Sequence, residues 1–427
     1  MTIRRKPEDF LVTERLNPVF RAAFTAAWGA AATHAVYELT KTSMTTPDAI
    51  QSLAREVNTR HADVGYAGLK DKHARTIQNL SLPVERAEHA AALPREIVGR
   101  GWSARLIAWS PREITADAID GNGFTIIVRS LSREACDEMG RRAHLLTITP
   151  RPATDSRKSA PAPTRGRVGV PLLITNYFGD QRFGSARHGQ GWAALPLIKG
   201  DFDAALRLAV GTPARKDSGR TRQFTRLCAE KWGRWKELAQ QLPRCPERKP
   251  FELLAQGKEP REAFAALPYL VQTMCVEAFQ SHLWNETARR LMLDLVKGYP
   301  DGAKPLRSED IQGELVFIPA SAVHEDIRTL DMPILAANTT LQQPWANAAR
   351  EVLREKELTQ DQLKIPGLRR PFFGEAPRQV FVRAERYTAA EPEPDELDER
   401  PKRLKRTLTF DLPRGSYATI LLRALGQ

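Results

Sequence analysis

The chain has 427 residues, of which 42% are hydrophobic and 27% charged, a composition typical of folded proteins and a length sufficient for two domains. Its 64 Lys and Arg residues exceed its 51 Asp and Glu residues, and the net charge of +13 favours a polyanionic partner. The four cysteines form no C-x-x-C pair, which excludes a zinc-finger or disulfide framework and fits the reducing cytoplasm. We expect no membrane association, because the N-terminus lacks the apolar core of a signal peptide and the Ala-rich run at 22–32 is too short to span a bilayer.

Strand and helix patterns begin close to the N-terminus. Phe10 and Val12 alternate with polar neighbours, which predicts a half-buried strand within residues 3–16. The alternating residues 34–41 predict a second strand. Thr46 precedes a proline and an aspartate and is predicted to cap a helix with one apolar face.

The stretch Asp63–Gln78 combines apolar residues and two glycines with the tripeptide Lys-Asp-Lys. Val64, Tyr66 and Leu69 predict a short buried strand that runs into a tight turn. Asp71 follows this strand between two lysines, whose ammonium groups favour its ionised form. An ionised carboxylate on a loop at a strand end is a candidate nucleophile or base. An ordinary turn aspartate between solvated lysines would give the same pattern.

Two further strands are predicted at 102–109 and 124–131. Between them, Gly121–Gly123 predicts a turn in which Asn122 takes left-handed dihedrals. A helix is predicted from about residue 132 to residue 146.

The middle of the chain begins with residues 149–170, which are rich in Pro, Arg, Ser and Ala and predict a flexible linker and domain boundary. Asn176–Gly184 mixes aromatic residues with arginine, a combination suited to RNA stacking and phosphate contact. Two of its glycines have P-loop spacing, but no lysine follows, which excludes a nucleotide-triphosphate site. The basic residues at 215–226 form either a phosphate track or a solvated face. Residues 269–297 predict a long packed helix.

The C-terminal part contains an acidic, proline-bearing segment at 391–400, which predicts a solvated loop. Leu408, Phe410 and Leu412 then alternate with other residues and predict a strand. Ser416 is predicted to cap the last helix.

Five of these stretches resemble motifs of the tRNA pseudouridine synthase D (TruD) family, in the family's order. Gly68–Gln78 matches every fixed position of the signature G-x-K-D-[KR]-x-A-x-T-x-Q, and Asn176–Gly184 matches N-Y-F-G-x-Q-R-F-G. Pro7–Glu14 resembles P-E-D-F-x-V-x-E, and Gly121–Phe124 resembles G-N-x-F. Residues 412–424 resemble L-P-x-G-S-[YF]-A-T-x-x-x-R-E. On these motifs the chain is identified as a member of that family.

The resemblance implies that Asp71 is the catalytic residue, and Lys70 is expected to orient it. The residues implied to hold the uridine are Phe10, Asn122, Phe124 and Tyr417. The candidate RNA contacts are Arg4, Arg182, Arg187 and Arg222. Two positions depart from the family pattern: Arg4 stands where many relatives have lysine, and Ala424 replaces a glutamate.

The implied fold is α+β. It has a pseudouridine-synthase catalytic core, with a mixed and mostly antiparallel sheet flanked by helices, built from residues 1–172 and 378–427. A TruD-type α/β domain is inserted at 173–377. The implied reaction isomerises uridine to pseudouridine at uridine-13 in the D-arm of tRNA. We expect no cofactor and no metal, because the reaction involves neither redox chemistry nor group transfer. We also expect a monomer whose partner is tRNA.

Two alternatives come from other functional classes. An RNA-binding tRNA chaperone of the same fold without catalysis is disfavoured, because such a protein need not keep Asp71 beside Lys70. A cofactor-dependent RNA methyltransferase would need a glycine-rich loop after its first strand, which Gly121–Phe124 does not supply.

Overall fold

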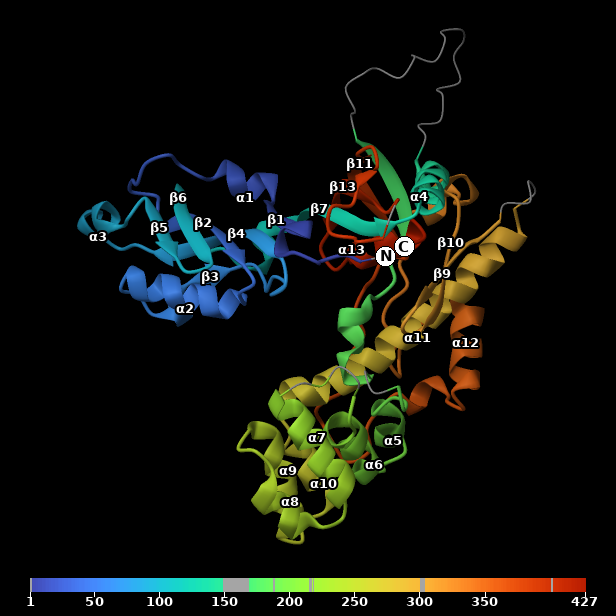
Figure 1. Ribbon diagram of the computed structural model, residues 1–427. Coiled ribbons are helices and arrows are strands. Elements are labelled where there is room, and N and C mark those ends of the chain that lie inside the picture. The colour runs from blue at the N-terminus through green and yellow to red at the C-terminus, as the bar shows by residue number, and fades with distance from the viewer. Residues whose placement is uncertain are drawn as a thin grey trace. The chain divides into compact units, whose positions relative to one another are not determined.

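The computed structural model describes residues 2–148, 169–186, 189–214, 217, 219–299, 304–400 and 402–427. The chain divides into two compact units (Figure 1). Unit 1 comprises Met1–Ile174 and Val382–Gln427, and unit 2 comprises Thr175–Phe381. Residues 149–168 of the predicted linker lie outside the described residues.

Unit 1 is built on one sheet. Its strands are β1 (Phe10–Leu16), β2 (His34–Thr42), β3 (Gly65–Tyr66), β4 (Arg75–Pro83), β5 (Glu96–Gly99), β6 (Trp102–Ser110), β7 (Ile119–Leu131), β8 (Val170–Thr175), β11 (Phe381–Ala389), β12 (Glu393–Pro394) and β13 (Leu404–Pro413). Their order is β5-β6-β2-β4-β1-β7-β13-β11-β8, with β3 paired to β4 and β12 to β13. Among the pairs whose register is described, β1 and β4 are parallel and the others are antiparallel. This mixed, mostly antiparallel sheet with helices confirms the predicted α+β fold.

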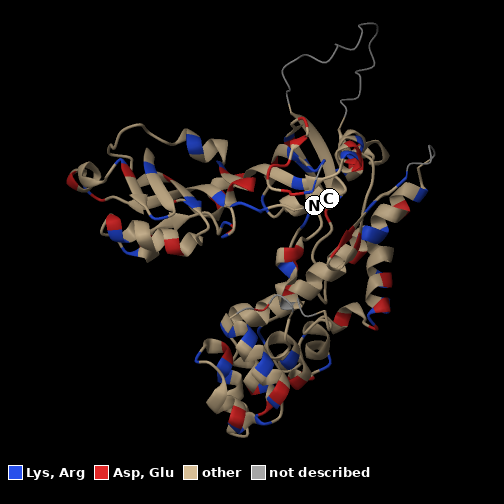
Figure 2. Ribbon diagram, in the orientation of Figure 1, with Lys and Arg blue, Asp and Glu red and all other residues tan. Residues whose placement is uncertain are grey.

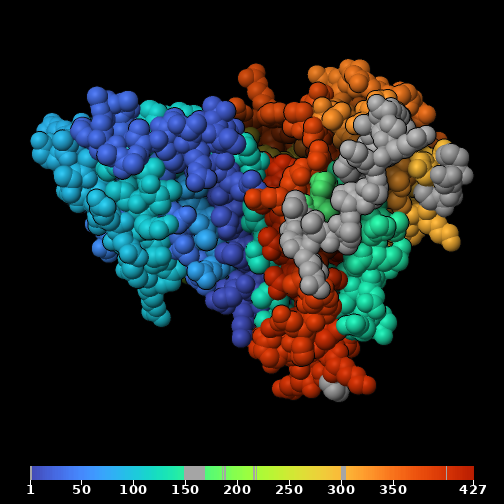
Figure 3. All heavy atoms as spheres, turned by 90° about the horizontal axis from the view of Figure 1, so that it is seen from above, coloured from blue at the N-terminus to red at the C-terminus, as the bar shows by residue number. Residues whose placement is uncertain are grey.

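The middle strands bring together segments that are far apart in the sequence. Strand β7 pairs with β1 on one side and with β13 on the other. In the space-filling view, blue N-terminal atoms and red C-terminal atoms of unit 1 lie on either side of a narrow teal band (Figure 3). The predicted strands around Phe10, at 34–41 and around Phe410 therefore belong to one sheet, with β4 between β2 and β1 and β7 between β1 and β13.

The helices of unit 1 are α1 (Pro18–Ala22), α2 (Thr46–Glu56), α3 (Ala87–Ala92), α4 (Arg133–Leu146) and α13 (Ala418–Ala424), with short 3₁₀ turns at Pro7–Asp9, His61–Asp63 and Ala116–Ala118. Helix α2 packs its apolar stripe, including Ile50 and Leu53, against Tyr37 and Leu80 of the sheet. Each of these four residues is at most 4% exposed. Burial of one such side chain contributes about 1.5–3 kcal/mol, so this contact anchors the segment that leads to Asp71.

The first residue of α2 differs from the prediction. Thr45 caps the helix, and its hydroxyl oxygen accepts a hydrogen bond of 3.2 Å from the main-chain nitrogen of Asp48. The buried hydroxyl of Thr46 instead donates to Gln78 Oε1 at 3.0 Å and accepts from the main-chain nitrogen of Lys70 at 3.1 Å. The prediction of Thr46 as cap was wrong because this side chain serves contacts with a distant part of the chain.

The predicted turn at Gly121–Gly123 is also wrong, since these residues lie inside strand β7. A Cβ atom at Gly121 would come within 2.1 Å of the main-chain oxygen of Leu412. Glycine is required here by the close approach of the neighbouring strand and not by a bend.

Two predictions of exposure need correction. Strand β3 has only two residues, and Tyr66 and Leu69 are 38% and 67% exposed, so this stretch is not a buried strand. The acidic segment 391–400 is not fully solvated, because Asp395 is 5% exposed and accepts a hydrogen bond of 2.7 Å from Arg129 Nη1. A buried cation on the sheet thus determines where this acidic loop folds back.

The predicted cap of the last helix is wrong as well. Helix α13 begins after Tyr417, and Ser416 makes no capping hydrogen bond. The hydroxyl of Ser416 is buried and has no hydrogen-bond partner. Ala424 at the end of this helix is fully buried, in keeping with an apolar residue at that position.

Unit 2 is mainly helical. Its elements are α5 (Ala194–Ile198), α6 (Phe202–Leu206), α7 (Gly219–Lys231), α8 (Trp235–Gln241), α9 (Lys249–Ala255), α10 (Pro260–Ala265), α11 (Tyr269–Lys297), α12 (Ala346–Glu355), the strands β9 (Leu306–Asp310) and β10 (Gly313–Phe317), a π-turn at Arg207–Gly211 and 3₁₀ turns at Asp180–Ala186, Pro246–Arg248, Ala320–Ala322, Glu325–Ile327 and Gln360–Gln362. The long helix α11 confirms the prediction for residues 269–297, and its buried Trp284 donates a hydrogen bond of 2.7 Å to the main-chain oxygen of Met332. Basic and acidic residues are interspersed along the helices of this unit (Figure 2).

In the described part of the chain, no helix is both long enough and apolar enough to cross a bilayer.

Candidate active site

Asp71 lies in the loop between β3 and β4, beside the start of β1. Its Oδ1 atom accepts a hydrogen bond of 2.9 Å from the main-chain nitrogen of His73, which closes a tight local turn. Its Oδ2 atom lies 2.8 Å from Arg4 Nη2, and the carboxylate side chain is 16% exposed. A carboxylate held by its own turn and by a guanidinium has a defined direction and remains accessible.

Arg4 joins this carboxylate to a row of aromatic rings. Its guanidinium carbon lies 4.2 Å from the centre of the Phe10 ring. Phe10 meets Phe124 edge to face at 6.2 Å, and Phe124 stacks on Phe410 at 5.4 Å. The backbone of Arg4 has a φ of 65°, a left-handed conformation that is strained for a side chain of this kind. Such strain is typical of functional positions.

Lys41 forms a hydrogen bond with the main chain of the Asp71 loop. It is fully buried, and its Nζ donates to the main-chain oxygens of Asp71 and Met44 at 2.9 Å and 2.8 Å. Burial lowers the pKa of Lys41 to about 8, an effect that the Asp71 carboxylate opposes and the Lys70 cation reinforces.

Lys70 does not point its ammonium group at Asp71 in the structure. Its Nζ lies 2.7 Å from Glu14 Oε1, and both side chains are buried. Glu14 Oε2 in turn accepts a hydrogen bond of 2.9 Å from the main-chain nitrogen of Asn79. Lys70 therefore forms its ion pair with Glu14, and Arg4 is the cation beside the Asp71 carboxylate. A role of Lys70 in orienting Asp71 stays a prediction.

Several buried polar atoms on this side of the sheet have no hydrogen-bond partner. They are Arg4 Nε, Thr76 Oγ1, Gln78 Nε2, Asn122 Oδ1 and Ser416 Oγ. Strand register places Thr76 beside Val12 and Asn122 beside Glu14, and Phe10, Val12 and Glu14 share one face of β1. Unsatisfied buried groups are costly and rare, so Thr76, Gln78 and Asn122 together on this face indicate a place for a polar ligand.

A family model described as tRNA pseudouridine synthase D (TruD) matches residues 1–425. The chain belongs to the TruD family.

Individual TruD relatives match along the whole chain. The tRNA pseudouridine synthase D of Aquifex aeolicus (strain VF5) is 26% identical over 433 residues, which covers 99% of this chain and 97% of the relative. The probable tRNA pseudouridine synthase D 2 of Methanocaldococcus jannaschii is 26% identical over 431 residues, covering 99% of this chain and 91% of the relative. The crystal structure of a putative TruD from Methanosarcina mazei has a TM-score of 0.66 at 22% identity, covers 99% of this chain and 92% of that chain, and supports the fold.

The TruD residues implied to hold the uridine differ in their surroundings. Phe10 and Phe124 are 3% and 9% exposed, with the face of Phe10 covered by Arg4. Asn122 and Tyr417 are half-buried. In the sheet, Asn122 lies opposite Leu412 of β13, only a few residues before Tyr417. The structure thus brings Arg4, Asp71, Phe10, Phe124 and Asn122 onto one side of unit 1.

The second TruD motif, Asn176–Gly184, serves a different purpose from the one predicted. Its aromatic residues Tyr177, Phe178 and Phe183 are at most 4% exposed and form part of the core of unit 2. Tyr177 donates a hydrogen bond of 2.7 Å to the main-chain oxygen of Val316. The prediction that these rings stack on RNA is therefore wrong, because they pack against protein.

The remaining candidate RNA contacts lie in unit 2. Arg182 Nη1 is 3.0 Å from Glu277 Oε2. Arg222 is exposed, and its Nε donates to the main-chain oxygen of Asp217 at 2.7 Å. Arg187 lies outside the described residues. Contacts of these residues with RNA stay a prediction.

Sequence reasoning missed Glu14 and Lys41 and gave Arg4 only a general RNA contact. Glu14 carries a signal that could have been used, since it shares the buried face of β1 with Phe10 and Val12 by simple alternation. Lys41 similarly alternates with the buried Tyr37 and Leu39. A charged residue on a buried face needs a partner, which marks both positions for attention.

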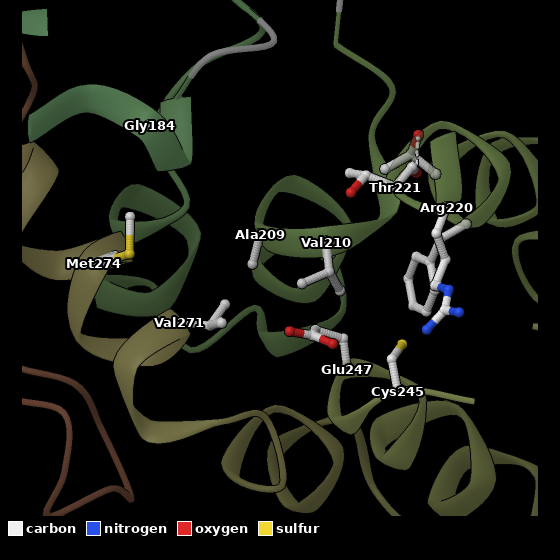
Figure 4. A pocket seen from close by; sticks show the side chains of 11 residues that line it. Gly184, Ala209, Val210, Arg220, Thr221, Cys245, Glu247, Val271 and Met274 are labelled. Atoms are coloured by element: carbon white, nitrogen blue, oxygen red, sulfur yellow. Dashed lines mark hydrogen bonds between the residues drawn. The ribbon is translucent and has the colours of Figure 1, made fainter. Parts of the chain in front are cut away.

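Unit 2 contains a separate hollow of about 310 Å³ (Figure 4). Val210, Val271 and Met274 supply apolar walls, and Arg220 and Glu247 supply the charged groups. None of the residues implied to act on uridine lines this hollow. Among the described residues, no group of three or more His, Cys, Asp or Glu side chains is placed to hold a metal ion.

Proposed function

We propose that this protein isomerises uridine to pseudouridine in tRNA, with Asp71 as the catalytic carboxylate and uridine-13 of the D-arm as the target. The observation that carries the proposal is the Asp71 carboxylate, held at 2.8 Å by Arg4 next to aromatic rings and unsatisfied buried polar atoms. Membership of the TruD family supports the reaction and the substrate class. The position within the tRNA rests on the resemblance alone.

The reaction breaks the N1–C1′ bond, turns the uracil, and forms a C5–C1′ bond. The C5 proton is lost and N1 gains a proton, so the atoms and electrons balance without a redox partner. As N1–C1′ breaks, C1′ becomes electron-poor, and an anionic Asp71 stabilises it as an ion partner or as a covalent ester. A carboxylate at this place also accepts the C5 proton in the last step.

The other residues act on the base. A uridine inside folded RNA must leave its stack, at a cost of a few kcal/mol that stacking on protein rings offsets. Phe124 and Tyr417 offer such rings, and Phe10 does so once Arg4 moves from its face. The unsatisfied Asn122 Oδ1 can accept the N3–H of uracil.

A comparison of the wild type with Asp71→Asn tests this proposal. Pseudouridine is mapped by carbodiimide treatment and primer extension on tRNA transcripts incubated with wild type or Asp71→Asn, without any added cofactor. The wild type should give a stop at position 13, and the variant should lower the rate by about 10²–10⁴-fold or more. Asp63→Asn is the matched control, because Asp63 lies nearby in an exposed pair with Arg60. If neither wild type nor variant modifies RNA while both bind it, the chaperone alternative replaces the proposal.

A further inference from the structure

The sheet of unit 1 has a hollow on the face opposite Asp71. Strand alternation places Thr13 and Arg15 on the face of β1 that does not carry Phe10, Val12 and Glu14. On this face lies a groove of about 1020 Å³, bordered by β1, α1, β4, β2 and β6. Its size exceeds that of a buried water site and suits an extended ligand.

Arginine dominates the charge of this groove. Four arginines line it: Arg15, Arg21, Arg105 and Arg386. Two carboxylates offset them, since Glu38 lies 3.1 Å from Arg105 and Asp411 is shared by Arg15 and Arg386. Asp120 adds a third negative charge that acts on Arg15, so four guanidinium groups against three carboxylates leave a surplus of one positive charge. Glu14 also borders the groove, but its charge is already matched by Lys70.

Arg15 and Arg386 share one carboxylate. Arg15 and Arg386 both meet Asp411 Oδ2, so one negative charge serves two cations. Burial and the charge of Arg386 lower the pKa of Arg15, and the charge of Asp120 partly opposes this. Arg386 is held with a φ of 54°, a strained conformation that turns its side chain toward Asp411. An additional anion at this point would relieve the repulsion between the two guanidinium groups.

Arg21 adds an uncommitted cation. It lies in the last turn of α1, is exposed, and has no ion-pair partner among the residues that the structure describes. Next to these cations the groove presents apolar surface from Leu16, Phe24 and Ile107. Cations that track a backbone beside apolar and aromatic walls are typical of sites for single-stranded nucleic acid.

The groove and the Asp71 side of the sheet have one residue in common. This residue is Glu14, whose carboxylate pairs with Lys70 on the Asp71 side and which also lines the groove. Beyond Thr13 the register pairing of β1 with β4 ends, and Glu14 binds the main-chain nitrogen of Asn79 in the gap.

We propose that this groove binds the phosphate backbone of an unpaired RNA segment outside the target nucleotide. The inference rests on the proposed function, which supplies RNA as the substrate. The groove acts in affinity and not in the chemical step, because it is separated from Asp71 by the sheet.

The test is the salt dependence of RNA binding. Binding of a tRNA transcript is measured at several KCl concentrations in an Asp71→Asn background, with and without Arg21→Gln and Arg386→Gln together. The two substitutions should lower affinity by about tenfold or more and reduce the slope of log K against log salt by about 1–2. Arg386→Gln leaves Asp411 paired with Arg15, so folding should persist, and thermal melting checks this.

Arg100→Gln is the matched control, because Arg100 is exposed in the turn between β5 and β6 and does not line the groove. In active protein, the groove substitutions should raise KM for tRNA and leave kcat unchanged. Unchanged affinity and unchanged salt slope would overturn the inference even if the enzyme is active. Conversely, a protein that binds RNA through the groove without forming pseudouridine would overturn only the proposed function.

Discussion

The buried ammonium group of Lys41 donates a hydrogen bond of 2.9 Å to the main-chain oxygen of Asp71. A second bond of 2.8 Å to the main-chain oxygen of Met44 fixes the other side of the same nitrogen. A cation in a dry environment is costly unless it is well bonded, so Lys41 and the loop fix each other's position. Lys41 is thus a positioning residue for the proposed catalytic carboxylate.

Replacing Lys41 with methionine should impair turnover more than RNA binding. Lys41→Met keeps much of the side-chain volume but removes both hydrogen bonds, so the Asp71 loop loses its anchor. A small displacement of a reacting group costs about 10²-fold in rate. We expect kcat to fall by about this factor with KM for tRNA little changed. Lys72→Met, which alters an exposed lysine next to Asp71, is the control, and equal kcat values for the two variants would contradict this role.

The lowered pKa of Lys41 predicts opposite pH trends for activity and stability. Activity that needs charged Lys41 should be lost as pH rises through about 8. Between pH 8 and the ordinary lysine value of 10.5, the unfolded chain holds a proton that the native protein has released. The contribution of Lys41 to stability therefore increases with pH in this window. pH–rate profiles at saturating tRNA and thermal melts of wild type and Lys72→Met should show both trends, which should disappear in Lys41→Met.

The pair formed by Glu14 and Lys70 predicts a large effect on folding. Glu14→Gln leaves the Lys70 ammonium buried without a counter-charge, which should reduce the free energy of unfolding by about 3–5 kcal/mol. The double variant Glu14→Gln/Lys70→Met removes that charge and should recover much of the loss. Chemical denaturation measures all three proteins. The prediction fails if the single and double variants are equally destabilised.

His282 in helix α11 should make the folded protein less stable at acidic pH. Burial lowers the pKa of His282 to about 4, and its ring stacks on Trp192 at 4.6 Å. As pH falls from about 6.5 to 4, the unfolded chain gains a proton that the native protein does not accept. Stability should therefore fall by up to about 3 kcal/mol over this range. His282→Gln should flatten this part of the stability curve, whereas His61→Gln, at an exposed position, should leave it unchanged.

Local patterns predicted most of the sheet because alternation directly reflects burial on one face. The strands around Phe10 and Phe410 and the helix at 269–297 followed from such patterns. Gly121–Gly123 could not be placed this way, because Gly121 is required by the close approach of the Leu412 backbone and not by a local bend. Thr46 was misplaced for a related reason, since its hydroxyl binds Gln78.

The candidate site was only partly predictable for the same physical reason. Asp71 and its motif were visible in one short stretch, but its supports come from distant residues. Lys41 lies 30 residues from Asp71, and Glu14 lies 56 residues from Lys70. Which cation faces which carboxylate depends on how distant segments come together, and this is why Arg4 lies beside Asp71 while Lys70 pairs with Glu14.

The central claim is that Asp71 drives loss of the C5 proton at a single uridine of tRNA. The most direct measurement is tritium release from transcripts labelled at C5 of uridine, in a pair that differs only by uridine or cytidine at position 13. The account predicts one equivalent of tritium per tRNA from the uridine transcript with wild type, and none from the cytidine transcript or with Asp71→Asn. Equal release from both transcripts would contradict the target, and release by Asp71→Asn at the wild-type rate would contradict the role of Asp71.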